Sequence, residues 1–247
     1  MSDLSHLKFL VTPPHPCSYL EDREAVTLFV DPTTKMTNQL YSAMSALGFR
    51  RSGKHVYRPH CGSCQACVPI RIPVDEFQPR RRHRRILSRN QDLVVEVRAA
   101  EYRDEYFALY CDYMASRHAD GDMYPPSPDQ FQSFLLSTWS DTHFLVFSRG
   151  EQPLAVAVID VINDGLSSIY SFFDPREERR SLGSNAILHQ IELARKMGLS
   201  HLYLGYWIEE CRKMTYKSEY QPFEQYRANR WVRIDDHTTN LEFPAGN

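Results

Sequence analysis

The sequence predicts an α/β (α+β) protein in two parts. Its second half alternates runs of β-branched and aromatic residues with segments of helical periodicity. Its first part contains a cluster of cysteines and ends in a run of arginines. With 247 residues, the chain is long enough to bury a sizeable core. We therefore expect a cysteine-containing N-terminal region with a basic linker, residues 1–90, and a second domain, residues 91–247.

The charge and the N-terminus exclude several classes of protein. The formal net charge is −2, so a nucleic-acid-binding surface has to be local and not a property of the whole chain. The N-terminal apolar run is too short for a signal peptide and is interrupted by Pro13 and Pro14. No segment has the length of a membrane span. We expect a cytoplasmic protein without contact to a membrane, with reduced thiols and no disulfide framework.

Three helices are predicted before the main β-rich stretch. The first covers residues 37–47 and stops at Gly48, a residue favoured just after a helix. Another begins at Ser127, which caps it ahead of Pro128. The helix between them is indicated by five apolar and aromatic residues at helical spacing: Tyr102, Tyr106, Leu109, Tyr110 and Tyr113.

The β-rich stretch predicts an acyltransferase-like core. Residues 143–150, 153–162 and 166–175 are β-type runs, and Asn163-Asp164-Gly165 between the last two is a hairpin signal. A helix at residues 182–198 and a strand at residues 201–207 follow. An antiparallel meander that leads into a helix and a returning parallel strand is the order of a GNAT-like acyltransferase core. In that core the fourth strand and the start of the helix form the acyl-donor site.

Three cysteines at C-x-x-C-x-x-C spacing, Cys61, Cys64 and Cys67, predict a metal-competent loop. Zinc needs a fourth ligand, for which we expect Cys17, with His15, His55 and His60 as substitutes. An iron–sulfur cluster accepts the same spacing. The alternatives are unmetallated structural thiols and a catalytic cysteine.

Three long blocks carry a resemblance to a known family. They are residues 48–72, GFRRSGKHVYRPHCGSCQACVPIRI, residues 170–188, YSFFDPREERRSLGSNAIL, and residues 202–224, LYLGYWIEECRKMTYKSEYQPFE. Together they resemble the aminoacyl-tRNA–protein transferases, and among these the short bacterial aspartate/glutamate leucyltransferases. The resemblance runs from about residue 17 to residue 231. It implies transfer of leucine from leucyl-tRNA to the α-amine of a protein that begins with Asp or Glu, which marks that protein for degradation through an N-degron pathway.

The chemistry that this resemblance implies requires little from the enzyme. The aminoacyl ester is already activated, and an α-amine with a pKa of about 8 is partly neutral near pH 7. Holding the two reactants together is worth about 7–11 kcal/mol in well-oriented systems. We therefore expect no covalent intermediate and no cofactor required for the transfer itself.

The tRNA would bind a local cationic surface. The candidates are Arg80, Arg81, Arg82, Arg84 and Arg85, with a solvated charged linker as the alternative. Gly183 and Ser184 belong to RRSLGSN, which resembles the GNAT pyrophosphate loop except that Asn185 replaces a small residue. This departure disfavours acetyl-CoA and leaves room for the 3′ end of tRNA.

The protein substrate and the leucyl group need further residues. An acidic side chain calls for a cation, for which the candidates are Arg50, Arg51, Lys54, Arg58, Lys213 and Lys217. The walls of a leucine pocket would be Tyr170, Phe172, Tyr203 and Tyr206. Glu209 would orient the amine or accept its proton, and Tyr216 would donate to the leaving ribose oxygen. The alternatives are surface charges, plain core aromatics and an ordinary Glu209–Lys213 helical pair.

Three other functions compete with leucyl transfer. The first is arginyl transfer to the same acidic N-termini, which differs only in the pocket that reads the amino acid. The second is a zinc-dependent RNA-binding module without catalysis, which leaves the acyltransferase-like half unexplained. The third is a CoA-dependent acetyltransferase, which predicts an intact pyrophosphate loop.

Overall fold

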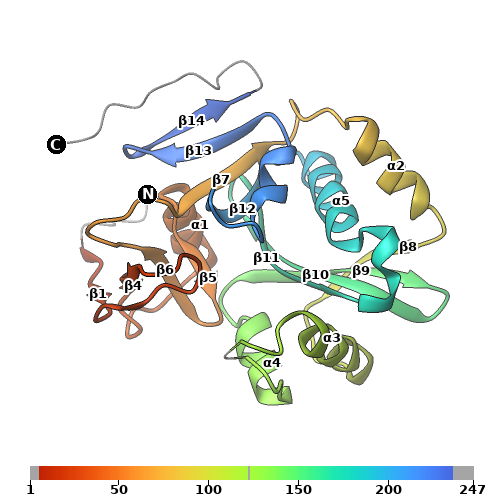
Figure 1. Ribbon diagram of the computed structural model, residues 1–247, viewed down its shortest axis with the longest axis horizontal. Helices are drawn as coiled ribbons and strands as arrows, with labels where there is room; N and C mark the ends of the chain where they lie inside the picture. Colours follow the sequence, from red (N-terminus) through yellow and green to blue (C-terminus); the bar gives the residue numbers. More distant parts are fainter. Residues whose placement is uncertain (1–5, 122, 236–247) are drawn as a thin grey trace.

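One large sheet organises the computed structural model, which describes residues 6–121 and 123–235 (Figure 1). Its strand order is β14-β13-β7-β12-β11-β10-β9-β8. The strands are β7 (Val68–Pro73), β8 (Val94–Ala99), β9 (Asp141–Arg149), β10 (Gln152–Ile162), β11 (Gly165–Phe173), β12 (His201–Trp207), β13 (Phe223–Arg227) and β14 (Arg230–Ile234). Strands β11 and β12 pair in parallel, whereas the other neighbours in this sheet pair antiparallel.

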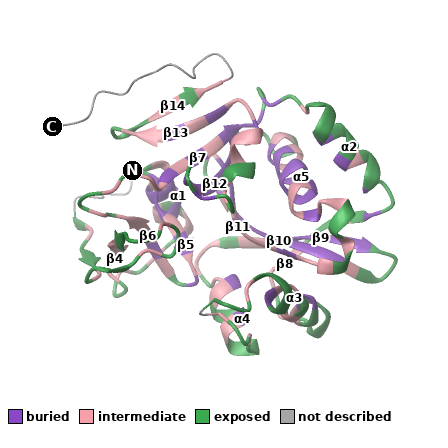
Figure 2. Ribbon diagram, viewed as in Figure 1, coloured by how far each residue is buried: buried purple, intermediate pink, exposed green. Residues whose placement is uncertain are grey.

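Helices cover both faces of this sheet. In Figure 1, α2 (Arg81–Arg89) and α5 (Leu182–Lys196) lie on one side of β9 and β10, and α3 (Asp104–Arg117) and α4 (Pro128–Leu135) on the other. Alternating residues of β9 point to the two sides, as the pleat requires. Phe144 packs with α3 and α4, whereas Leu145 packs with the start of α5. The buried residues in Figure 2 accordingly follow the sheet and the inner side of α5.

The N-terminal region forms a smaller sheet of order β1-β4-β6-β5. Its strands are β1 (Phe9–Val11), β4 (Thr27–Val30), β5 (Arg50–Ser52) and β6 (His55–Pro59), and β2 (His15–Pro16) pairs separately with β3 (Glu24–Ala25). Helix α1 (Asn38–Ala46) confirms the first predicted helix. Thr37 accepts a hydrogen bond from the Leu40 amide at its start, and Gly48 follows its end with φ +81°.

The predicted acyltransferase-like order is confirmed. Strands β10 and β11 pair up to Ile162 and Gly165, so that Asn163 and Asp164 form the hairpin turn. Helix α5 then returns the chain to β12, which lies parallel to β11. Two short 3₁₀ helices, η2 (Pro175–Arg180) and η3 (Thr215–Glu219), lie before α5 and after β12.

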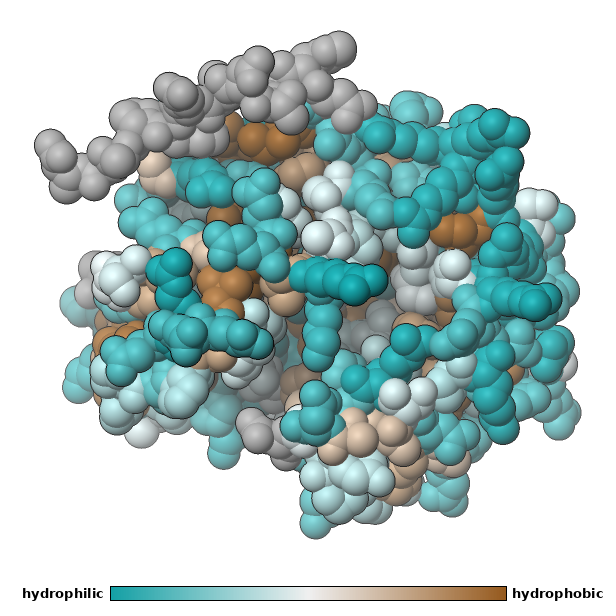
Figure 3. Space-filling model, viewed as in Figure 1, coloured by the Kyte–Doolittle hydropathy of each residue, from teal (hydrophilic) through white to brown (hydrophobic). Residues whose placement is uncertain are grey.

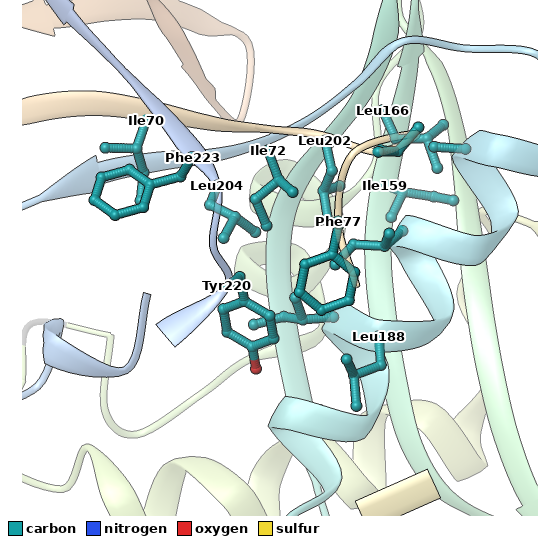
Figure 4. Packing of buried hydrophobic residues seen from close by; sticks show 14 of the residues in the cluster. Ile70, Ile72, Phe77, Ile159, Leu166, Leu188, Leu202, Leu204, Tyr220 and Phe223 are labelled. Carbon is teal, nitrogen blue, oxygen red and sulfur yellow. The ribbon is translucent and has the colours of Figure 1, made fainter. Parts of the chain in front are cut away.

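The two predicted regions share the large sheet, because β7 comes from the first of them. It lies between β12 and β13. Ile70 and Ile72 of β7 pack with Leu202 and Leu204 of β12 and with Leu188 of α5 (Figure 4). The division at residue 90 therefore stays a prediction about organisation and does not separate two independent sheets.

The arginine run, which we expected to form a basic linker, is helical instead. It forms helix α2, which is anchored by two buried side chains, His83 and Ile86. Its arginines lie on the other sides of the helix, which are exposed (Figure 2). A separate observation is that, within residues 6–121 and 123–235, none of the helices has the length and apolar character needed to cross a bilayer.

The small sheet is fixed to the large one by a buried ion pair. Both side chains, Arg51 of β5 and Asp160 of β10, are 0% exposed, with 2.7 Å between Arg51 Nε and Asp160 Oδ2. Arg51 also donates to Asp160 Oδ1 and to the backbone carbonyls of Gly53, Phe134 and Leu135. All five N–H donors of this guanidinium are thereby used.

Substitution Arg51→Met should therefore destabilise the fold. It leaves a buried carboxylate without its partner, which typically costs about 3–5 kcal/mol of the free energy of unfolding. Urea unfolding measures the change. The control is Glu96→Gln, which breaks an exposed ion pair with Arg98 and should cost less than about 1 kcal/mol. Equal effects of the two substitutions would contradict this account of Arg51.

Candidate active site at the fork of strands β11 and β12

Strands β11 and β12 separate within the sheet. Their pairing ends at Ser167 and Tyr203. Beyond this point each strand has backbone carbonyls that the other no longer reaches. We call the segment after Ser167 and Tyr203 the fork. Its carbonyls need other partners, because a buried C=O without a hydrogen bond is costly.

Arg50 fills the β11 side of the fork. Its Nη2 donates to the carbonyls of Ser168 (2.6 Å) and Ile169 (3.4 Å). The guanidinium lies against Gly205 of β12, where a Cβ would overlap it. Gly205 has φ +75°, a conformation that glycine adopts without strain. Glycine at position 205 is thus what lets Arg50 enter the fork.

Lys217 of η3 occupies the β12 side. Its Nζ donates to the carbonyls of Leu204 (2.9 Å) and Tyr206 (2.6 Å). Burial, and after it the positive charge of Arg50, lowers the pKa of this amine from 10.5 to about 7. Two cationic side chains from distant parts of the chain therefore meet in the fork, each bonded to one strand.

The ring of Tyr216 borders these cations, and further aromatic rings lie beyond it. Tyr216 precedes Lys217 and is 39% exposed; burial raises its pKa, and nearby Arg50 lowers it. Burial and then Tyr216 raise the pKa of Tyr113, in α3, to about 12. The ring of Tyr113 lies 6.3 Å from that of Tyr170 of β11. Tyr113 is not among the site residues predicted from the sequence, because its helical spacing indicated only a core position.

The four residues predicted to wall one leucine pocket do not lie together. Tyr170 donates to Met114 of α3, and Phe172 is completely buried in the cluster with α3 and α4. Tyr203 instead donates to Asp164, and Tyr206 donates to the carbonyls of Gly48 and Tyr57. Of the four, Tyr170 is the one that contacts the Tyr113 ring beside Tyr216.

The other predicted charges lie outside the fork. Arg51 has no free donor for a substrate carboxylate. Lys54 is exposed on the β5–β6 turn, and Arg58 lies 5.0 Å from the centre of the Phe49 ring. Lys213 and Glu209 are exposed in the loop after β12. This loop forms turns, so the alternative of a helical Glu209–Lys213 pair is not formed there.

Helix α2 adjoins the segment that carries Lys217. The imidazole of His83 stacks on the Tyr220 ring, with 5.2 Å between centroids and 2° between planes. Arg82 forms an ion pair with Glu219 of η3. Burial raises the pKa of Tyr220, and Ser184 in the first turn of α5 lowers it, so these two side chains lie close together. The arginine helix, the start of α5 and η3 are therefore neighbours.

The surface over α2 is a cationic one. Arg81, Arg84 and Arg85 are exposed there. Figure 3 shows predominantly hydrophilic side chains over this part of the molecule. Gly183 shares the first turn of α5 with Ser184, where helix N–H groups have no partner within the helix.

The cysteines gather close to the fork. Burial, and after it the neighbouring thiols of Cys17, Cys61 and Cys64, raises the pKa of Cys67 to about 12. The thiol of Cys61 also accepts a hydrogen bond from the Val26 amide at 3.4 Å. Among residues 6–121 and 123–235, however, no three His, Cys, Asp or Glu side chains are arranged to hold a metal ion. The residue types fit zinc or a cluster, whereas the arrangement of their side chains in space does not.

Comparison with known proteins decides the family. Residues 15–85 match the family model described as "Arginine-tRNA-protein transferase, N terminus", and residues 105–227 match the one for its C terminus. The chain belongs to the arginine-tRNA-protein transferase family. In this transferase the first matched segment supplies Arg50 and the second supplies Gly205 and Lys217, so the fork is built by both.

Close relatives share one name, aspartate/glutamate leucyltransferase. The protein from Alcanivorax borkumensis is 56% identical over 94% of this chain and 96% of its own. That from Saccharophagus degradans is 51% identical over 94% and 99%, and that from Pseudomonas aeruginosa 52% over 95% and 100%. A solved structure described as L-PGS from Bacillus licheniformis matches 59% of this chain and 46% of its own, with 9% identity and a TM-score of 0.47.

Substitution Gly205→Ala should lower the activity of the transferase. The new Cβ displaces the Arg50 guanidinium, and we expect the kcat/KM of aminoacyl transfer to fall about tenfold or more, since misplaced site groups are that costly. The matched control is Gly150→Ala. Gly150 also has a positive φ, +60°, but a Cβ there meets no atom within 4 Å. If both variants lost activity equally, backbone strain and not Arg50 would be the cause.

Proposed function

We propose that this chain moves leucine from leucyl-tRNA to the α-amine of proteins that begin with Asp or Glu. The observation that carries the proposal is the fork. There Arg50 and Lys217 present cationic groups beside Tyr216, which in turn lies near Tyr113. Close relatives of the chain are named aspartate/glutamate leucyltransferase. The product would be a protein marked for degradation.

Arg50 is suited to bind an anion in this reaction. In the described part of the chain only its Nη2 donates to the protein, so Nε and Nη1 retain free donors. A guanidinium with two free donors can bind a carboxylate or a developing oxyanion through paired hydrogen bonds. Arg50 would therefore hold the acidic side chain of the protein substrate or the carbonyl oxygen of the leucyl ester.

The charge of the fork favours leucine over arginine as the donated residue. An arginyl side chain next to Arg50 and Lys217 would be repelled unless a carboxylate intervened. The rings of Tyr113 and Tyr170 offer an apolar surface that suits a leucyl side chain. Arginyl transfer remains the competing hypothesis that the assay below decides.

The tRNA would run along α2 towards the start of α5. Exposed arginines at Arg81, Arg84 and Arg85 would contact phosphates. The free N–H groups near Gly183 and Ser184 would receive the 3′ end, since helix N-termini bind phosphate. Because charged tRNA is made in the cytoplasm, we place the reaction there.

We also propose that Cys17, Cys61, Cys64 and Cys67 hold a structural zinc ion or an iron–sulfur cluster. The observation in support is that Cys17, Cys61 and Cys64 lie near enough to Cys67 to raise its pKa, after the larger effect of burial. Bound metal would require them to lose their protons and move closer together. Acyl transfer from an ester to an amine exchanges no electrons, so this group would shape the N-terminal region and not react.

The proposed function is tested by an acyl-transfer assay. The protein is mixed with tRNA charged with labelled leucine or labelled arginine and with peptides that begin with Asp, Glu or Ala. We expect label from leucyl-tRNA on the Asp and Glu peptides, and none on the Ala peptide. Label from arginyl-tRNA alone would establish arginyl transfer, and equal labelling of the Ala peptide would contradict the specificity.

Substitution of Arg81 and Arg85 together by Gln should weaken tRNA binding. Each phosphate contact contributes about 0.7–0.9 to the slope of log K against log salt, so the slope should fall by about 1–2. Filter binding of leucyl-tRNA at several salt concentrations measures it. The control substitutes two other arginines by Gln, Arg98 on β8 and Arg103 before α3. It also removes two positive charges and should leave the slope unchanged.

Metal content tests the cysteine proposal. Protein purified without oxygen should contain zinc, or iron and sulfide with absorbance near 400 nm as expected for a cluster. Substitution Cys67→Ser should lower the bound metal, whereas Cys111→Ser, in α3, should not. Protein without metal at wild-type thermal stability would contradict the proposal.

A further inference from the structure

We propose that Lys217 is the proton carrier of the reaction: it takes a proton from the attacking α-amine and returns one to the leaving ribose oxygen. This inference rests on the proposed function and adds a chemical group to it. From the sequence, Lys217 is a candidate for substrate binding, and positioning alone is expected to drive the transfer. The arrangement of the fork points to a more specific role.

The hydrogen bonds of the Lys217 amine leave room for one exchangeable proton. The carbonyls of Leu204 and Tyr206 accept two hydrogen bonds from Nζ. A charged ammonium has three N–H donors, and a neutral amine has two and a lone pair. With two positions fixed by β12, a single position remains. In the neutral form that position is the lone pair, so the amine is oriented to exchange one proton.

The surroundings of this amine favour its neutral form. Burial removes water from the ammonium, and after this effect Arg50 of β5 places a permanent positive charge in the same fork. Both disfavour the charged form. Cys211, from the loop after β12, acts in the opposite direction when ionised. With these three effects the pKa of Lys217 is about 7. Near neutral pH, a large fraction of the amine is therefore able to accept a proton.

The other predicted base, Glu209, lies outside the fork. Glu209 is exposed in the loop after β12. In the described part of the chain no hydrogen bond or ion pair joins it to Arg50 or Lys217. Tyr216, by contrast, adjoins Lys217 and lies under the influence of Arg50. Its phenol has a raised pKa and so stays protonated, which suits a donor and not a base.

The step balances without any further reactant. The nitrogen of the α-amine attacks the carbonyl carbon of the leucyl ester, and a C–N bond forms. That nitrogen gives one proton to neutral Lys217, which becomes an ammonium. The C–O bond to the ribose breaks, and its oxygen takes a proton from the ammonium, directly or through the Tyr216 hydroxyl. Lys217 ends neutral, and the products are an amide and a free tRNA 3′ end.

Substitution Lys217→Arg tests this role. Arginine keeps the positive charge and can donate to the same carbonyls, but it does not give up its proton. We expect kcat to fall about 100-fold or more, since positioned proton transfer contributes about 10²–10⁴. The KM for the acceptor peptide should stay within about threefold. The control is Lys196→Arg at the exposed end of α5, which should behave as wild type.

The pH profile separates proton transfer from charge recognition. In the wild type, kcat should rise with pH through an inflection near 7, and the inflection should be absent in Lys217→Arg. It should also be the same for two acceptor peptides whose α-amines differ in pKa, because it belongs to the enzyme. A variant that keeps kcat and loses only affinity would show that Lys217 binds charge, which would overturn the proposal.

A second measurement does not depend on catalysis. The chain has six lysines, so the side-chain carbons next to the amines can be followed by NMR in labelled protein. One resonance should titrate near pH 7 and be missing in Lys217→Met, and an ordinary titration near 10.4 for Lys217 would overturn the proposal. If the wild type transferred no leucine, the proposed function would fail. If it did so and Lys217→Arg matched it, only this inference would.

Discussion

The ion pair between Arg51 and Asp160 is the constraint on which the candidate site depends. It is fully buried and fixes strand β5 of the small sheet to strand β10 of the large one. Successive residues of a strand point to opposite sides. Once Arg51 is bonded to Asp160, its neighbour Arg50 has to point the other way, into the fork between β11 and β12. A structural contact thus places a functional side chain.

The fork solves a backbone problem and creates a chemical site at the same time. Where β11 and β12 cease to pair, their carbonyls are satisfied by Arg50 and Lys217. Burial, and after it the positive charge of Arg50, makes the Lys217 amine easier to deprotonate. An arginine cannot respond in this way. The pair therefore combines a permanent cation for anions with an amine that can exchange a proton.

The position of helix α2 would connect the proposed tRNA-binding surface to this site. His83 stacks on Tyr220, whose side chain lies close to Ser184 at the start of α5, and η3 with Lys217 directly precedes Tyr220. A basic helix fixed in this way would bind the phosphates of the tRNA close to the fork and not at a remote surface. The arginines can stay exposed because the apolar contacts of His83 and Ile86 hold the helix.

Much of the fold and part of the site could be predicted from the sequence. Thr37 and Gly48 bounded α1, Asn163 and Asp164 formed the hairpin turn, and the meander, α5 and β12 followed in the expected order. These features depend on residues a few positions apart, whose backbone preferences act locally. The long motif blocks that indicated the family are likewise runs of consecutive residues.

Only the tertiary structure decided which charged residues could act. The sequence made Arg50 and Arg51 equal candidates, and long-range contacts gave Arg51 to Asp160 and Arg50 to the fork. Lys217 became exceptional through burial beside Arg50, 167 positions away (217 − 50). By itself the sequence determined helix α1, the order of the acyltransferase-like core and the family. The tertiary structure alone determined the chemistry of each side chain, because pKa values and free hydrogen-bond donors depend on neighbours in space, which local spacing does not specify.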